Sequence, residues 1–235
     1  MAGIVKRIEH ATHLLRDYPN ALRVRARSTH VRVPREWSTG SGRAVVLIPG
    51  VYETWHFLHA VGNALNERGH PVHVIRSLGW NVRPIPESAA IVARELAARD
   101  LREVALVAHS KGGLIGKHLM SNDDPDGRVD RLIAVATPFS GSGMARLTVG
   151  RTLRAFLPSD TVIRGLVASR EHNARLTSIY PSFDPNIPEG SRVEGAVNVE
   201  IPVVGHFRIL DASQTITAVI AAVEREGERE VTGQG

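Results

Sequence analysis

One hydroxyl group in this chain stands where a strand-to-helix turn could make it a nucleophile. Ser110 lies in the segment ALVAHSKGGLIG (105–116), which has apolar runs on both sides of a short polar group. The residues two before and two after it are Ala108 and Gly112, and only small residues fit there when the turn is tight. Gly113 would let the following helix pack close to the strand. This G-x-S-x-G pattern, with alanine at its first glycine, predicts a nucleophilic serine; the alternative is an ordinary polar turn.

A serine hydroxyl is a weak nucleophile until a base takes its proton, and an acid must orient that base. We expect His206, one of eleven histidines, to be the base because it follows the last apolar strand candidate. The acid is expected in the preceding segment SFDPNIPEGS, where Asp184 is the first candidate and Glu189 the second; Asp160 is a more distant alternative. His109 adjoins the serine, should point away from it, and is assigned a structural role.

The oxyanion that forms during acyl transfer needs preorganised N–H donors. One donor is expected to be the backbone N–H of Lys111, directly after the serine. The other is expected in the turn LIPGVYETW (47–55), where the N–H of Val51 is the first candidate and that of Tyr52 the alternative. The side chain of Lys111 is expected to lie exposed on the first turn of its helix.

The elements that must hold these residues alternate along the chain as in a parallel sheet with crossover helices. Short, continuous apolar runs predict strands that are buried on both faces, and apolar residues at three- and four-residue spacing predict helices. The candidate strands are 44–48, 72–75, 104–108, 132–136 and 197–204, and the candidate helices are near 55–68, 87–100, 111–121 and 213–226. The expected fold class is α/β: a mostly parallel central sheet with helices on both faces and a small helical, lid-like insertion.

Three parts of the chain are distinguished by composition. A basic N-terminal extension is expected to hold an amphipathic helix and then an alternating stretch that could form an edge strand. The main domain follows, and within it one segment breaks the alternation with short amphipathic helices and could form a lid; the charged tail is expected to be frayed. The boundaries are 1–42 for the extension (helix 4–15, strand 21–33), 43–226 for the main domain, 139–180 for the lid-like segment and 227–235 for the tail.

Composition excludes several classes of protein. The chain has no cysteine, which excludes a disulfide framework, a thiolate metal site and a cysteine nucleophile. Two H-x-x-H pairs, at residues 10/13 and 56/59, lack a third ligand at a recognisable spacing, so we expect no metal and no cofactor. No signal peptide or membrane-spanning segment is seen, and a cytoplasmic location is expected.

The net charge of +5 comes from the N-terminal end of the chain. Residues 1–43 hold nine Lys or Arg against three Asp or Glu, and the remainder is nearly neutral. Weak association with an anionic membrane surface is one interpretation of this surplus, and a solvated surface rich in arginine is the other. No aromatic residues interleave with the arginines, so we expect no nucleic-acid partner.

Four motifs in the right order resemble those of the small bacterial lipases and esterases of the α/β-hydrolase superfamily. They are VVLIPGVYETWHFLHAVGNALNERGH, VALVAHSKGGLIG, AVATPFSGS and FDPNIPEGSRVEGAVNVEIPVVGHFRIL, which together span about residues 43–225. The resemblance implies the triad Ser110, Asp184 and His206, with Val51 and Lys111 as oxyanion donors. The chain departs from the family pattern in having P-G where H-G precedes the oxyanion donor, and Phe139 where a histidine is usual.

The function expected is that of a serine hydrolase that cleaves carboxylic esters, with a small-molecule or lipid ester carrying a hydrophobic acyl group as substrate. We expect Tyr52, Phe139, Phe156 and Phe207 to contact that substrate. A thioesterase, an amidase or an acyltransferase with the same triad is the nearest alternative. A catalytically silent binding protein with this fold is another.

Overall fold

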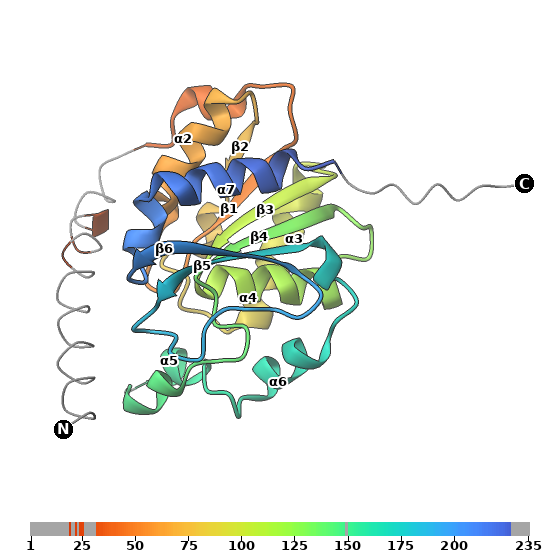
Figure 1. Cartoon of the computed structure of the whole chain (residues 1–235). Helices are drawn as coiled ribbons and strands as arrows, with labels where there is room; N and C mark the ends of the chain where they lie inside the picture. The colour runs from red at the N-terminus through yellow and green to blue at the C-terminus, as the bar shows by residue number, and fades with distance from the viewer. Residues whose placement is uncertain (1–18, 20–21, 23, 26–31, 149, 227–235) are drawn as a thin grey trace, which may run out of the picture.

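The structure, a computed structural model, describes residues 19, 22, 24–25, 32–148 and 150–226. Its centre is a six-stranded sheet in the order β2-β1-β3-β4-β5-β6, and every neighbouring pair is parallel (Figure 1). The strands are β1 (Val45–Ile48), β2 (Val72–Val74), β3 (Val104–His109), β4 (Val129–Val135), β5 (Leu176–Phe183) and β6 (Val197–Val204). All the strands therefore end at the same edge of the sheet, where loops that are distant in sequence can meet.

Strands β1 and β3, which are neighbours in the interior of the sheet, are buried on both faces, as their continuous apolar sequences predict. In β1, Val46 and Ile48 pack into the core on one side of the sheet, while Val45 and Leu47 pack into the core on the other side. Every residue of β1 and β3 is buried. This two-sided burial fixes the sheet between two helical layers.

The helices lie in those two layers (Figure 1). The first layer contains α2 (His59–Glu67) and α7 (Ser213–Glu224), and the second contains α3 (Ile85–Ala98) and α4 (Lys111–His118), with the short α5 (Arg151–Arg154) and α6 (Thr161–Ala168) beyond them. Short 3-10 helices occur at η1 (Arg35–Ser38), η2 (Trp55–Leu58), η3 (Arg76–Leu78), η5 (Gly143–Leu147), η6 (Asn173–Arg175) and η7 (Arg208–Asp211), and α4 continues into a π-helical turn, η4 (Leu119–Asp123).

Strand β5 was not predicted from the sequence, and its first residues lie within the expected lid-like segment. Its sequence, LTSIYPSF, has polar residues and a proline inside the apolar pattern. The ladder between β4 and β5 ends at Ile179, and the pairing with β6 shifts register after Pro181. Pro181 thus lies beyond the end of the ladder with β4, so the absence of its N–H removes no hydrogen bond to that strand. The segment 139–180 therefore contains short helices followed by the start of β5, and its role as a lid stays a prediction.

The expected edge strand over 21–33 is wrong where the structure describes it, because Leu22, Val24 and Arg25 are helical. The other predicted strands and helices occur within a few residues of their expected bounds. The predicted helix at 4–15 and the tail at 227–235 lie outside the described residues. Across the described part of the chain, no helix combines the length and apolar character needed to cross a membrane.

Candidate active site

Ser110 occupies a sharp turn between the end of β3 and the start of α4. Its backbone angles are φ 52° and ψ −119°, a region that non-glycine residues rarely adopt. The turn is held because the Ser110 N–H donates to the carbonyl of Val135 at 2.9 Å and the Thr137 hydroxyl donates to the Ser110 carbonyl at 2.9 Å. Strain that is paid for by such anchors is characteristic of functional turns, and here it presents a serine side chain at the edge of the sheet.

The glycines behind the serine are required by close packing. A Cβ atom on Gly112 would lie 2.2 Å from the carbonyl oxygen of Ile48, at the end of β1. A Cβ atom on Gly113 would lie 2.1 Å from the hydroxyl oxygen of Thr137. The helix can therefore start directly behind the serine only because both positions lack side chains.

The structure brings Ser110, His206 and Asp184 together, although they come from three different loops. The His206 Nε2 lies 3.0 Å from the Ser110 Oγ, and the His206 Nδ1 lies 2.7 Å from the Asp184 Oδ2. All three residues are buried. This is the spacing at which a base can take a proton from a hydroxyl while an acid orients the base.

Asp184 is itself held in place by its own turn. Its Oδ1 accepts hydrogen bonds from the backbone N–H groups of Asn186 at 2.8 Å and Ile187 at 3.2 Å, which leaves Oδ2 for the histidine. The two alternative acids are engaged elsewhere: Glu189 accepts from the N–H of Gly143, and Asp160 caps the N-terminus of α6. The geometry therefore favours Asp184 as the acid.

The expected oxyanion donors lie on either side of the serine. Lys111 is the first residue of α4, and Val51 lies in the turn after β1, beside the same pocket. Among the described residues, no acceptor is assigned to the backbone N–H of either residue. The turn is strained at Tyr52, whose φ is 59°, and the buried carboxylate of Glu53 accepts the N–H of Gly50 at 2.9 Å. Each of the two donors thus lies next to a residue of unusual backbone conformation, Tyr52 in one case and Ser110 in the other.

The side chain of Lys111 is buried, which overturns the expectation that it is exposed. Its ammonium donates to the carbonyl oxygens of Asn81, at 2.7 Å, and Arg83. Burial lowers the pKa of Lys111 to about 8, and the charge of Glu87 opposes the shift only in part. Lys111 therefore joins the helix behind the serine to the loop at residues 79–84.

A pocket of about 450 Å³ opens at the serine and is mainly apolar. Tyr52, Phe156 and Phe207, three of the expected substrate contacts, line it, and so do Leu22 and Arg25 of the N-terminal extension. Other apolar side chains in its wall are Met144, Leu147, Leu153 and Ile187.

Phe139 is a correction among the expected substrate contacts, since it is not among the described residues that line the pocket. Its ring is buried in the core, with the Lys117 ammonium 5.8 Å from its centroid. The preceding residue, Pro138, lines the pocket instead.

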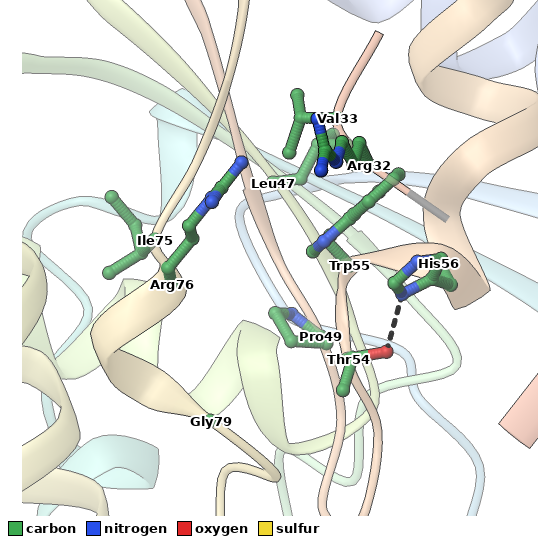
Figure 2. A pocket seen from close by; sticks show the side chains of 10 residues that line it. All are labelled: Arg32, Val33, Leu47, Pro49, Thr54, Trp55, His56, Ile75, Arg76 and Gly79. Carbon is green, nitrogen blue, oxygen red and sulfur yellow. Dashed lines mark hydrogen bonds between the residues drawn. The ribbon is translucent and has the colours of Figure 1, made fainter. Parts of the chain in front are cut away.

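A second pocket, of about 260 Å³, is lined in part by Pro49, Thr54, Trp55 and His56 (Figure 2). Arg32 and Arg76 contribute to its wall, and the hydroxyl of Thr54 lies 2.9 Å from the His56 Nδ1 within it. It contains no residue of the candidate triad. In the described part of the chain, no group of three or more His, Cys, Asp or Glu residues is arranged to hold a metal ion.

Sequence reasoning missed two buried polar residues beside the site. The signal for Glu53 is that it is the one acidic residue in the turn LIPGVYETW. That signal is weak because carboxylates in turns usually face solvent. Asn81 is fully buried with a φ of 51°, and its side-chain amide donates to the carbonyl of Pro49 at 2.7 Å. An Asn in a short loop is the signal that could have indicated a left-handed turn there.

No family model matches the sequence. Among solved structures, Bacillus licheniformis lipase BlEst2 in its mature form aligns with a TM-score of 0.62 at 14% identity, covering 83% of this chain and 94% of that one. Aspergillus fumigatus lipase B aligns with a TM-score of 0.66 at 17% identity, covering 84% and 56% respectively. A monoacylglycerol lipase from Paleococcus ferrophilus aligns with a TM-score of 0.55 at 13% identity, covering 79% and 96%. These likenesses confirm the expected α/β-hydrolase fold.

Proposed function

We propose that this protein is a serine hydrolase that cleaves carboxylic esters through an acyl-enzyme. The observation that carries the proposal is the unbroken chain of contacts from Asp184 through His206 to Ser110, at the opening of an apolar pocket. A polar turn with no chemical role would not require a strained serine within hydrogen-bonding distance of a buried imidazole, nor a buried carboxylate bonded to that imidazole.

In the acylation step, the Nδ1–H of His206 donates to the carboxylate of Asp184, which leaves the Nε2 lone pair facing the serine. As the Ser110 Oγ attacks the ester carbonyl, Nε2 takes the hydroxyl proton. The carbonyl oxygen becomes an oxyanion, and the N–H groups of Val51 and Lys111 are proposed to receive it. When the tetrahedral intermediate collapses, His206 returns the proton to the leaving alkoxide, and the alcohol departs.

Deacylation repeats these steps with water in place of the serine. His206 takes a proton from water as its oxygen attacks the acyl carbonyl, and then returns that proton to the Ser110 Oγ as the acid is released. One ester and one water thus become one acid and one alcohol, and the side chains return to their starting protonation states.

The lining of the pocket supports a hydrophobic acyl group as the part of the substrate that is recognised. Met144, Leu147, Leu153 and Phe156 come from the segment between β4 and α6, so this segment is proposed to cover the acyl chain. The names of the solved lipases with this fold are consistent with such a substrate. A thioester substrate or an acyl acceptor other than water would use the same residues.

The test is hydrolysis of p-nitrophenyl esters from acetate to palmitate, comparing the wild-type protein with Ser110→Ala. We expect the wild type to turn over and Ser110→Ala to lose about 10³-fold or more in kcat. Ser77→Ala, which removes an exposed hydroxyl bonded to Glu95, is the matched control and should retain wild-type activity. A fluorophosphonate probe should label the wild type and Ser77→Ala, but not Ser110→Ala.

Equal inertness of the wild type and Ser110→Ala towards all esters and the probe would contradict the proposal and favour a binding protein with this fold.

Two sequence-based expectations stay predictions: the cytoplasmic location, and weak attraction of the basic N-terminal extension to anionic membranes. Vesicle sedimentation with and without anionic lipid, using full-length protein and protein lacking residues 1–40, tests the second.

A further inference from the structure

His109 has no part in the proposed reaction, yet both nitrogens of its buried ring are engaged. The Nδ1 lies 2.9 Å from each carboxylate oxygen of Glu53, and the Nε2 lies 3.0 Å from the backbone carbonyl oxygen of His206. His109 and Glu53 are almost completely inaccessible to solvent. The residue adjacent to the serine in sequence is therefore linked to the loop that carries the candidate base.

The protons in this network can be assigned from the chemistry of its ends. A backbone carbonyl only accepts, so the Nε2 of His109 must carry a proton. A backbone N–H only donates, so the Glu53 Oε2 accepts the Gly50 N–H at 2.9 Å. One further proton lies between Glu53 and the Nδ1 of His109, and the pair is neutral overall wherever that proton rests. Every donor in the chain from Gly50 to His206 then has an acceptor, as burial requires.

The two ends of this chain are the two loops that the proposed reaction must bring to the serine. Gly50 precedes Val51 in the turn that is expected to receive the oxyanion, and His206 is the candidate base. The rings of His109 and His206 also pack against one another, with centroids 4.8 Å apart. The Phe207 ring covers the same group, 5.7 Å from the centroid of His109.

We infer that Glu53 and His109 are positioning residues that hold the oxyanion turn and the His206 loop in a fixed relation to Ser110. This inference rests on the proposed function. The His206 side chain reaches the serine from a backbone whose carbonyl is bound to His109, so loss of that bond frees the imidazole to drift from its 3.0 Å contact. Misplacement of a reacting group by about 1 Å costs about 10²-fold in rate. The turn is strained at Tyr52, so it also needs the Glu53 anchor to keep its shape.

The test is the second-order rate at which a fluorophosphonate labels Ser110 in full-length variants. Glu53→Ala and His109→Ala should each lower this rate by about 10- to 100-fold. Glu53→Gln should stay within about threefold of the wild type, because its amide oxygen can accept the Gly50 N–H while its NH₂ donates to the Nδ1 of a neutral His109. In ester hydrolysis, the two alanine variants should lose kcat with little change in KM.

His70→Ala is the matched control. His70 is also buried, and its Nδ1 lies 3.0 Å from a backbone carbonyl, that of Arg43, but it is not connected to the triad. This variant should melt at a lower temperature while labelling at the wild-type rate. Near-wild-type labelling of both Glu53→Gln and His70→Ala would separate a positioning role from a general effect on stability.

The outcomes are distinguishable. If the wild type itself is not labelled, the proposed function fails. If the wild type is labelled and folded Glu53→Ala and His109→Ala are labelled equally fast, or Glu53→Gln is as slow as Glu53→Ala, the positioning role is overturned. If His109→Ala does not fold, Glu53→Ala decides. If neither folds, Glu53→Asp decides: its shorter side chain cannot span both partners, and a wild-type labelling rate would overturn the inference.

Discussion

The ammonium of Lys111 lies 2.7 Å from the carbonyl oxygen of Asn81, and this contact ties the helix behind the serine to a loop that has no triad residue. Asn81 extends the link, because its side-chain amide donates to the carbonyl of Pro49 at 2.7 Å. Pro49 precedes the turn that contains Val51. A buried polar bridge thus anchors Pro49, and Glu53 anchors Gly50, in the segment that leads to the expected oxyanion donor.

Asn81→Ala should remove this bridge and leave the buried carbonyl of Pro49 without its donor. We expect the free energy of unfolding to fall by about 1–3 kcal/mol, which is the cost of an unsatisfied buried group. In ester hydrolysis, the fold decrease in kcat should exceed the fold increase in KM. Steady-state kinetics and urea unfolding measure both. Asn66→Ala, which also loses side-chain bonds to backbone carbonyls but far from the serine, is the control. An unchanged kcat in a folded Asn81→Ala would contradict the prediction.

Lys111→Met should change how stability depends on pH. The pKa of Lys111 is lowered from 10.5 to about 8 in the folded protein, so below pH 8 the lysine is charged in both states and its burial opposes folding. Between about pH 8 and 10.5 the folded protein has lost this proton while the unfolded chain keeps it, so stability rises with pH.

The measured quantity is the free energy of unfolding of the wild type minus that of Lys111→Met. From pH 7.5 to 9.5 this difference should rise by about 2 kcal/mol, since each pKa unit corresponds to about 1.4 kcal/mol. Groups common to both proteins, including Lys117 with its similarly lowered pKa, cancel in the subtraction. A difference that stays flat across this range would show that Lys111 does not titrate there.

Gly113→Ala tests the packing that brings α4 behind the serine. The new Cβ would lie 2.1 Å from the hydroxyl oxygen of Thr137, and that hydroxyl donates a hydrogen bond to the Ser110 carbonyl. We expect a loss of about 1–3 kcal/mol in the free energy of unfolding and slower labelling of the serine. At Gly165, in α6, an added Cβ would have no neighbouring atom within 4 Å. Gly165→Ala should therefore raise the free energy of unfolding by up to about 1 kcal/mol through helix propensity. Urea denaturation of the two variants checks the opposite signs.

Met144→Trp should shorten the acyl chain that the pocket accepts. Met144 is half-buried in the pocket wall, and a larger ring there would fill space that a long chain needs. Hydrolysis of the p-nitrophenyl dodecanoate relative to the acetate should fall by about tenfold or more, while Met144→Leu, which conserves volume, should keep the wild-type ratio. A ratio unaffected by the tryptophan would place the acyl chain elsewhere.

The parts of this molecule that sequence could predict are those with local signals. β1 and β3 were predictable because fully buried parallel strands are continuous apolar runs, and the serine because its turn demands small neighbours. β5 was missed because polar residues and a proline interrupt its pattern. The buried state of Lys111 was missed because its acceptors come from a loop about 30 residues away. Such contacts depend on which loops the sheet brings together, and no short window of sequence contains that information.

The all-parallel order of the sheet has a consequence for how the site comes into existence. No two neighbouring strands are joined by a hairpin, so each pairing closes a long loop, and folds rich in such non-local contacts assemble slowly. Ser110 and His206 are 96 residues apart, and the loop of His206 follows β6, the last strand along the chain. A partly folded or truncated chain could keep much of its helix content and still be chemically silent. If Ser110 reacts as proposed, its labelling is therefore a stricter measure of native assembly than any spectroscopic signal from the helices.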